Sequence, residues 1–198
     1  MTGHDATAGP RPPDDGPAAR RLQELRTGAP DAATVLAWFD ELPAVGLADL
    51  TGRWRGSELP SGHPLDGLLT AYGWYGKEVV DPETVHPLLW QRAGGPPGPI
   101  SLDLVPVPLL RDYAHLARNP LARAAFAALR PLLGTGSPRA RARLVEHRGV
   151  LTAALVYDRL PVIDVFRRVT ADTLLGEMDL RGQPAPYFFT LHRAPAAG

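Results

Sequence analysis

Residues 139–193 read RARARLVEHRGVLTAALVYDRLPVIDVFRRVTADTLLGEMDLRGQPAPYFFTLHR, and this stretch decides the fold. It contains five runs of seven to nine residues, rich in apolar and β-branched side chains and joined by tight connections. This spacing is typical of an antiparallel meander. The sequence therefore predicts five consecutive strands within residues 137–194, at about 139–147, 150–157, 161–168, 173–180 and 186–193. Because so long a sheet must close or be covered to avoid free edges, we expect it to curl into a β-barrel.

Alternation along these strands sorts their side chains into two faces. In residues 161–168, Val162, Asp164 and Phe166 share one face, and the two apolar partners indicate that this face is inside. An unpaired carboxylate would be costly there. Asp164 is therefore expected to pair with a cation such as Arg168, or to stay protonated and act as an acid. The rival register would leave Asp164 in solvent.

Two further carboxylates on the meander are candidates for acid–base chemistry. In residues 139–147 the arginines share one face, so Glu146 falls on the other face and can point inward. In residues 173–180, Glu177 and Asp179 share one face, and one of the two faces of this strand must be exposed. Buried carboxylates whose surroundings separate their pKa values can serve as general acid and base. A structural salt bridge is the alternative for each of them.

Upstream of the meander, the sequence predicts two helices and then a strand. Residues 18–26 have helical composition, and Asp31 can cap a second helix through residues 31–42. In LTGRWRGSEL, residues 50–59, Leu50, Gly52, Trp54 and Gly56 alternate with the polar residues Thr51, Arg53, Arg55 and Ser57 in the manner of a strand, with Trp54 facing inward.

The middle of the chain is expected to hold shorter elements. Pro106 and Pro108 would confine their segment to an edge or to extended backbone, and Pro120 would break or kink the helix that contains it. The predicted elements are, in order, a helix from near Pro64 to Gly73, two strands within residues 77–92, a loop at 94–99, an edge or extended segment at 100–110 and a helix over 111–133.

Composition limits the classes of function that the chain can have. Its 198 residues suit one domain, at residues 18–198, after a polar tail at residues 1–17. Basic and acidic residues are equal at 21 each, which argues against nucleic acid as a partner. No run is long and apolar enough to span a bilayer, no leader is recognisable and cysteine is absent, so we expect a cytoplasmic location. No metal-binding, nucleotide-binding or serine-hydrolase motif is found, and no cofactor is expected.

The segment Gly52-Arg53-Trp54-Arg55-Gly56 matches the signature of the GXWXG protein family. HPLD at residues 63–66 and GWYGK at 73–77 resemble the continuation of that family, which gives a GXWXG segment at residues 32–95. Residues 156–193 resemble the domain of unknown function that usually accompanies it. The resemblance implies a lipocalin-like barrel, in which a glycine-spaced tryptophan on the first strand plugs one end. A lyase that opens terpene epoxides is similar to this family, which favours an enzyme.

Three residues near this signature have both a structural and a functional interpretation. Trp54 is expected to plug the barrel, and alternatively to form a wall of a ligand pocket. His63 can cap a helix that starts at Pro64, or contact a ligand. Lys77 is the only lysine of the chain and lies beside Trp74 and Tyr75. It is expected to be solvated, but if it is buried it becomes a plausible base or hydrogen-bond donor.

The sequence thus predicts a mainly β protein with α-helices, in which an antiparallel lipocalin-like barrel encloses a small, largely apolar organic molecule. The first hypothesis is a cofactor-independent lyase, isomerase or cyclase of secondary metabolism, and the second is a non-catalytic carrier or sensor of a lipid or pigment. A third possibility, an interaction module that uses the row of arginines on one face of residues 139–147, has less support. The candidate catalytic residues are Asp164, Glu146, Asp179 and Lys77, and the candidate ligand-binding residues are Trp54, His63, Trp74, Tyr157, Phe166, Met178 and Phe188.

Overall fold

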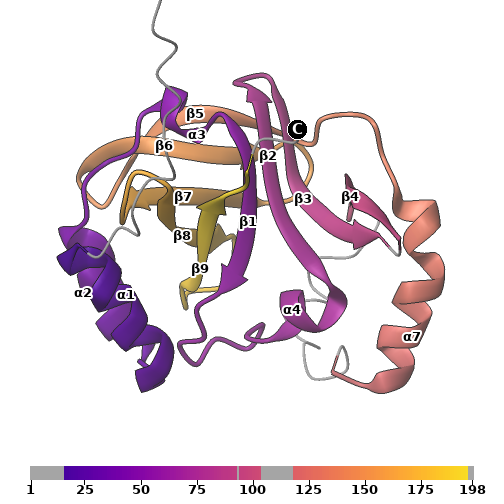
Figure 1. Cartoon of the computed structure of the whole chain (residues 1–198), viewed down its shortest axis with the longest axis horizontal. Coiled ribbons are helices and arrows are strands. Elements are labelled where there is room, and N and C mark those ends of the chain that lie inside the picture. Colours follow the sequence, from indigo (N-terminus) through magenta and orange to yellow (C-terminus); the bar gives the residue numbers. More distant parts are fainter. Residues whose placement is uncertain (1–15, 93, 104–117, 196–198) are drawn as a thin grey trace, which may run out of the picture.

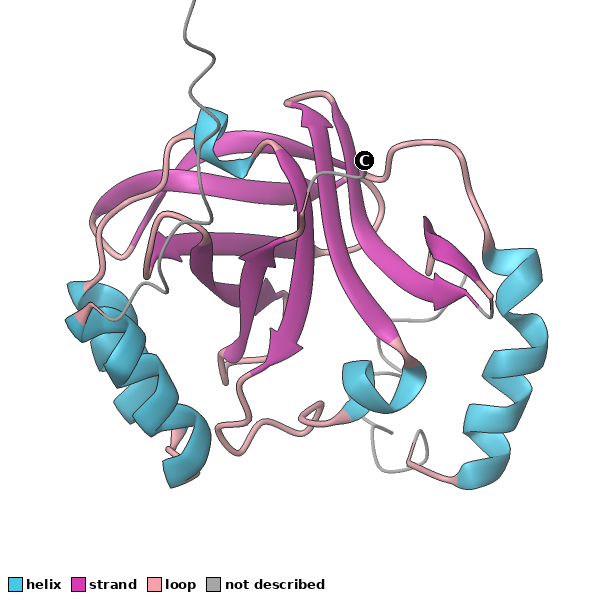
Figure 2. Cartoon of the chain, viewed as in Figure 1, coloured by secondary structure: helices cyan, strands magenta, loops and turns pink. Residues whose placement is uncertain are grey.

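The computed structural model of the chain describes residues 16–92, 94–103 and 118–195. Strands hold more of these residues than helices do, and the helices lie outside the sheet (Figure 1; Figure 2). The strands are β1 (Gly52–Glu58), β2 (Trp74–Asp81), β3 (Thr84–Arg92), β4 (Gly95–Pro99), β5 (Ala140–His147), β6 (Val150–Tyr157), β7 (Val162–Arg168), β8 (Thr173–Leu180) and β9 (Tyr187–Arg193). The helices are α1 (Pro17–Gly28), α2 (Ala32–Glu41), α3 (Leu47–Leu50), α4 (Leu68–Tyr72), α7 (Pro120–Leu129) and the 3₁₀-helix η1 (Arg130–Leu133).

The strands form an antiparallel, barrel-like sheet. Strand β1 pairs with both β2 and β9, and β5 to β9 pair in chain order. Strand β3 pairs with β2 and, through Val85 and Ala140, with β5, which completes a ring of eight strands. Strand β4 extends β3 outside this ring. The predicted α+β fold with an antiparallel barrel is therefore confirmed.

The meander follows the sequence closely, since the bounds of β5 to β9 agree with the predicted runs to within one residue. The β5–β6 hairpin shows how tightly its strands are joined. Its two loop residues, Arg148 and Gly149, have φ angles of 52° and 75°. Positive φ at both positions is the geometry of a type I′ turn, whose twist matches that of the flanking strands.

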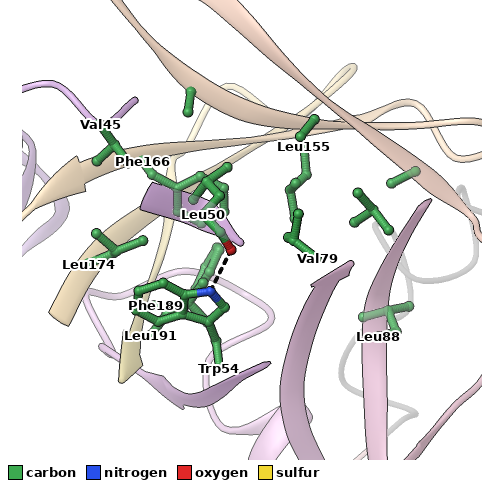
Figure 3. Close-up of a cluster of buried hydrophobic side chains, with 14 of the residues drawn as sticks. Val45, Leu50, Trp54, Val79, Leu88, Leu155, Phe166, Leu174, Phe189 and Leu191 are labelled. Carbon is green, nitrogen blue, oxygen red and sulfur yellow. Dashed lines mark hydrogen bonds between the residues drawn. The ribbon is translucent and has the colours of Figure 1, made fainter. Parts of the chain in front are cut away.

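One wall of the barrel buries both of its faces. The inner face carries a cluster in which the side chains of Trp54, Leu155, Phe166 and Phe189 converge (Figure 3). The outer face packs against α1 and α2, which lie together on one side of the barrel, away from α7 (Figure 1). Phe188 belongs to this outer cluster, so the interior position expected for it is wrong.

Several elements between the barrel strands differ from the sequence prediction. Residues 94–99 were expected to form a loop, but residues 95–99 pair with β3 as β4. The helix expected from Pro64 begins only at Leu68, because the residues before it form turns. Of the break or kink expected at Pro120, the structure excludes the kink, because α7 begins at this residue, where its missing N–H is harmless and the side chain of Asn119 caps the helix.

Three sequence predictions fall partly on residues that the structure does not describe. The tail expected at residues 1–17 lies outside the described residues except for its last two, and α1 already begins at Pro17. Most of the proline-containing segment at 100–110, and the first part of the helix expected over 111–133, also lie outside them. Among the described helices, none is long and apolar enough to cross a membrane.

Candidate functional site

A buried ion pair crosses the interior of the barrel. Lys77 on β2 and Asp164 on β7 are 3% and 1% exposed, and their Nζ and Oδ2 atoms are 2.8 Å apart. Asp164 thus lies on the inner face, as its alternation with Phe166 predicts. Its partner is not Arg168, which instead contacts Asp49. The expectation that Lys77 is solvated is wrong.

Tyr157 on β6 joins Lys77 and Asp164 in a network of polar side chains. Its hydroxyl donates to Asp164 Oδ2 at 2.8 Å and accepts from Lys77 Nζ at 3.1 Å. The ammonium group also donates to the backbone oxygen of Pro87 at 3.1 Å. Burial, together with the negative charge of Asp164, raises the pKa of Tyr157 well above its usual value of 10.0. Tyr157 therefore remains a neutral hydrogen-bond donor.

Aromatic rings surround the ammonium group of Lys77. Its Nζ atom lies 4.8 Å from the ring centre of Phe189, 5.5 Å from that of Trp74 and 5.6 Å from that of Tyr157. Ring faces attract cations, and more strongly where water is excluded. Phe189 was not singled out from the sequence, although its alternation with Tyr187 and Leu191 on a strand could have placed it on the same face.

A second cluster of polar side chains, formed by Tyr187 and Glu58, lies along the same inner wall. Asp164, Met178 and Tyr187 are neighbours across β7, β8 and β9 in the sheet register. The hydroxyl of Tyr187 donates to Glu58 Oε1 at 2.5 Å. Burial, followed by the charge of Glu58, raises the pKa of Tyr187 well above 10.0, and the charge of Asp164 adds to this shift. Tyr187 therefore also remains protonated.

Glu58 connects this group to the start of α4. Its carboxylate accepts the backbone N–H groups of Leu69 at 3.3 Å and Thr70 at 2.8 Å. Sequence reasoning missed both Glu58 and Tyr187. The alternation of side chains along β1 could have indicated Glu58, because it places Glu58 on the same face as Trp54 and Gly56.

His63, in the segment between β1 and α4, is 3% exposed and packs edge-on against Tyr187, with 5.3 Å between ring centres. Its Nδ1 atom accepts the backbone N–H of Leu65 at 3.1 Å. Asp66 holds the loop, because its Oδ2 atom accepts the N–H groups of Ser61, Gly62 and His63 at 2.8–2.9 Å. Burial lowers the pKa of His63, against the opposing charge of Asp66.

Trp54 lies in the inner cluster, where its Nε1 atom donates to the backbone oxygen of Leu50 at 2.7 Å (Figure 3). The guanidinium group of Arg193 lies 4.2 Å from the centre of its ring. This environment fits the expected plug. Phe166 and Met178 also lie in or against the inner cluster.

The other two predicted carboxylates are not near the ion pair. Glu146 and Asp179 are both exposed, so the expectation that Glu146 points inward is wrong. Glu177 is the buried carboxylate of β8, and it meets His147 Nε2 at 2.9 Å. This contact belongs to the outer wall, on the face that carries Leu175.

Two surface hollows of about 210 and 490 Å³ are found away from the ion pair. The smaller hollow lies between α1 and the outer wall and is lined in part by Arg26 and His192. The larger lies between α4 and α7 and is lined in part by Tyr72 and Phe126. Neither is lined by the Lys77–Asp164 pair. Within the described ranges, no group of three or more His, Asp or Glu residues is arranged to hold a metal ion.

Comparison with known proteins agrees with this architecture. The profile described as "GXWXG protein" matches residues 37–95, and that of a domain of unknown function, DUF4334, matches residues 138–193. No curated protein matches the chain. A crystal structure of a protein from Thermomonospora curvata is similar, with 31% sequence identity and a TM-score of 0.65 over 89% of this chain and 98% of that one. The chain belongs to the GXWXG family and carries the accompanying domain of unknown function in its carboxyl-terminal half.

Proposed function

We propose that the chain binds a small, largely apolar organic molecule inside the barrel and transforms it by cofactor-independent acid–base chemistry. The observation that supports this proposal is the polar network of Lys77, Asp164 and Tyr157 within an apolar and aromatic interior. The reaction would be an elimination, isomerisation or cyclisation, because a carboxylate base and a phenolic donor can perform each of these by moving protons alone.

A purely structural role explains this network poorly. Removing two charges from water costs several kcal/mol per ion, and the attraction between them repays that cost only in part. Apolar residues of similar volume often stabilise such a position equally well or better. The inner wall already supplies such residues around the pair, among them Leu155 and Phe166. A buried group whose pKa is strongly shifted beside a specific charge, as that of Tyr157 is, marks a candidate functional site.

The three side chains would have separate roles. Asp164 would accept a proton from the ligand. Tyr157, which burial keeps protonated, would donate a hydrogen bond or a proton to a ligand atom that gains electron density. Lys77 would hold the carboxylate in place and offset its charge through the 2.8 Å contact.

Met178 provides the simplest way to make room for a ligand beside this network. It lies opposite Asp164 in the β7–β8 register and is only partly buried against the inner cluster. An unbranched thioether side chain can repack around different shapes at low cost. Binding would therefore displace Met178 before it disturbs the rings that surround Lys77.

The experiment that tests this function combines identification of a ligand with one substitution. Small molecules that co-purify with the protein are first identified by mass spectrometry. Apolar candidate substrates are then incubated with the protein, and their conversion is measured by gas chromatography. Asp164→Asn keeps the shape of the side chain and an oxygen that can face Lys77, but removes the base. We expect conversion to fall at least about 100-fold while ligand binding is retained.

Glu146→Gln is the matched control, because it makes the same change at an exposed carboxylate of the barrel. It should leave conversion and binding unchanged. Normal conversion by the Asp164→Asn variant would overturn the assignment of the base. If a ligand co-purifies but is never converted, the chain is instead a carrier or sensor.

A further inference from the structure

Three polar atoms in the segment between β1 and α4 are buried without a hydrogen-bond partner among the described residues. They are Ser61 Oγ, His63 Nε2 and Asp66 Oδ1. Nearly all buried polar groups in folded proteins are hydrogen-bonded, and a ligand or an ordered water can satisfy the exceptions. Of the three atoms, the one on His63 belongs to a ring that packs against the inner wall, through Tyr187.

The contacts of His63 determine where its proton lies. Because Nδ1 accepts the N–H of Leu65, it cannot carry a proton itself, and in a neutral ring the proton is then on Nε2. Burial favours the neutral form by lowering the pKa of His63. The ring therefore presents a buried N–H donor that has no acceptor among the residues that the structure describes.

Tyr187 links this donor to the sheet row that carries Asp164. Tyr187 contacts His63 on one side and, on the other, belongs to the sheet row that contains Met178 and Asp164. The hydroxyl of Tyr187 is already engaged by Glu58, so Tyr187 does not supply the missing acceptor. A molecule lying over Met178 could reach both the His63 donor and the Asp164 carboxylate.

The charges around the donor limit what it can bind. Three carboxylates, on Glu58, Asp66 and Asp164, act on Tyr187, beside His63. A carboxylate or phosphate group of a ligand would be buried beside these carboxylates, where an anion without a cation of its own is costly. A neutral oxygen that accepts a hydrogen bond avoids this cost.

We propose that His63 donates a hydrogen bond from Nε2 to an uncharged oxygen atom of the ligand. The ligand is then an apolar molecule that carries a carbonyl, ether, epoxide or hydroxyl oxygen. This inference rests on the proposed function and narrows its substrate class. The hydrogen bond orients the ligand with its oxygen toward His63 and the adjoining carbon atoms toward Asp164.

The test uses pairs of ligands of equal shape that differ in the oxygen. Cyclohexanone is compared with methylenecyclohexane, and 2-adamantanone with 2-methyleneadamantane. Dissociation constants are measured for the full-length protein by competition with an apolar fluorescent probe, N-phenyl-1-naphthylamine. In the wild type we expect each ketone to bind about tenfold more tightly than its methylene analogue, the effect of one hydrogen bond in an apolar site.

Two substitutions and one control locate the effect. His63→Phe should abolish the preference for the ketones, and His63→Gln, which keeps an amide N–H donor, should restore part of it. His192→Gln is the control, since His192 lies beside α1 on the outer wall, and it should leave the preference unchanged. Nitrogen NMR of the ¹⁵N-labelled wild type should show His63 protonated on Nε2, with this signal shifted by the ketones alone.

The outcomes separate this inference from the proposed function. Equal binding of ketone and methylene analogues, or an Nδ1-protonated His63, overturns the inference and leaves the proposed function standing. If neither member of either pair binds, the proposed function fails and this inference falls with it. An unchanged preference in folded His63→Phe protein would place the donor elsewhere.

Discussion

The interior of this barrel holds charges whose effects can be separated one residue at a time. Lys77 and Asp164 are 87 positions apart in the sequence, and each provides the main compensation for the charge of the other. Tyr157 and the carbonyl of Pro87 satisfy the remaining protons of the ammonium group. The network therefore behaves as a unit, and removing Lys77 or Asp164 leaves the other charge buried without its counter-ion.

Lys77→Met should lower the free energy of unfolding by about 3–5 kcal/mol, because it leaves the carboxylate of Asp164 buried and unpaired. Adding Asp164→Leu should recover most of this loss, because both charges are then gone. Urea unfolding followed by tryptophan fluorescence measures both variants. A double variant as unstable as the single one would show that the loss comes from packing and not from the unpaired charge.

Two histidines should make the stability of the protein depend on pH. Burial lowers the pKa of His63 and that of His192, which the charge of Arg26 lowers further. Below the unfolded value of about 6.5, the unfolded chain binds protons that the folded chain resists. The free energy of unfolding should therefore be highest above pH 6.5 and fall as the pH decreases toward 5.

Urea unfolding at several pH values between 5 and 8 measures this slope. His63→Gln and His192→Gln, which remove the titrating rings, should each flatten it. The lowered carboxylate pKa values, such as those of Asp49 and Asp81, act only at lower pH. If the slope in both variants equals that of the wild type, other groups cause the pH dependence.

At the scale of elements, strands β1 and β2 can pack closely because glycines at two positions have no side chain that would clash. A Cβ atom on Gly56 would lie 2.2 Å from the ring of Trp74, and one on Gly76 would lie 2.0 Å from the backbone oxygen of Trp54. Gly76 also has a φ angle of 151°, which other residues rarely adopt. Gly56 of the family signature and Gly76 of its continuation therefore allow tryptophan side chains and backbone to approach closely.

Gly76→Ala should destabilise the protein by at least about 2 kcal/mol, because the clash is with backbone and cannot be relieved by a rotamer change. Gly136→Ala is the control, since no atom of the described residues lies within 4 Å of the position of its Cβ atom. Thermal unfolding of both variants measures the difference. Equal melting temperatures would show that β1 and β2 can separate without loss.

Trp54→Ala should cost roughly 3–5 kcal/mol, the range for removal of a buried large aromatic side chain. Its indole also donates to Leu50 and lies beneath Arg193. Chemical unfolding and binding of N-phenyl-1-naphthylamine should be measured together. Near-normal stability with lost binding would make Trp54 a ligand-binding residue and not a structural plug.

The sequence predicted elements well where side-chain alternation and turns agreed. Strands β5 to β9 satisfy both criteria, and their bounds were correct to within one residue. Strand β4, GPPGP, has neither alternation nor β-branched residues, and it pairs only because β3 offers its edge. Alternation also placed Asp164 inside, but it could not identify Lys77 as its partner, because barrel closure alone brings β2 and β7 together.

The whole molecule consists of a barrel-like sheet with one wall covered by α1 and α2. Leu22 and Leu25 of α1 are buried in the outer cluster, together with Val35 and Phe39 of α2. Arg26 extends the contact, donating to Thr190 on β9 at 2.6 Å. The amino-terminal helices thus contribute to the stability of a wall whose inner face carries the candidate site.

The last prediction separates this covering layer from the residues that precede it. Residues 1–15 contain hardly any large apolar side chains, so their deletion should change the melting temperature by no more than about 2 °C. Deleting residues 1–30 also removes α1 and uncovers the apolar outer wall. Burying two leucines stabilises a fold by about 3–6 kcal/mol, and 1 kcal/mol corresponds to roughly 2–4 °C for a domain of this size. The longer deletion should therefore lower the melting temperature by at least about 6 °C, and Leu22→Ala with Leu25→Ala in the full chain should reproduce most of that loss. If the short deletion alone has the larger effect, the first fifteen residues contribute packing that their composition does not predict.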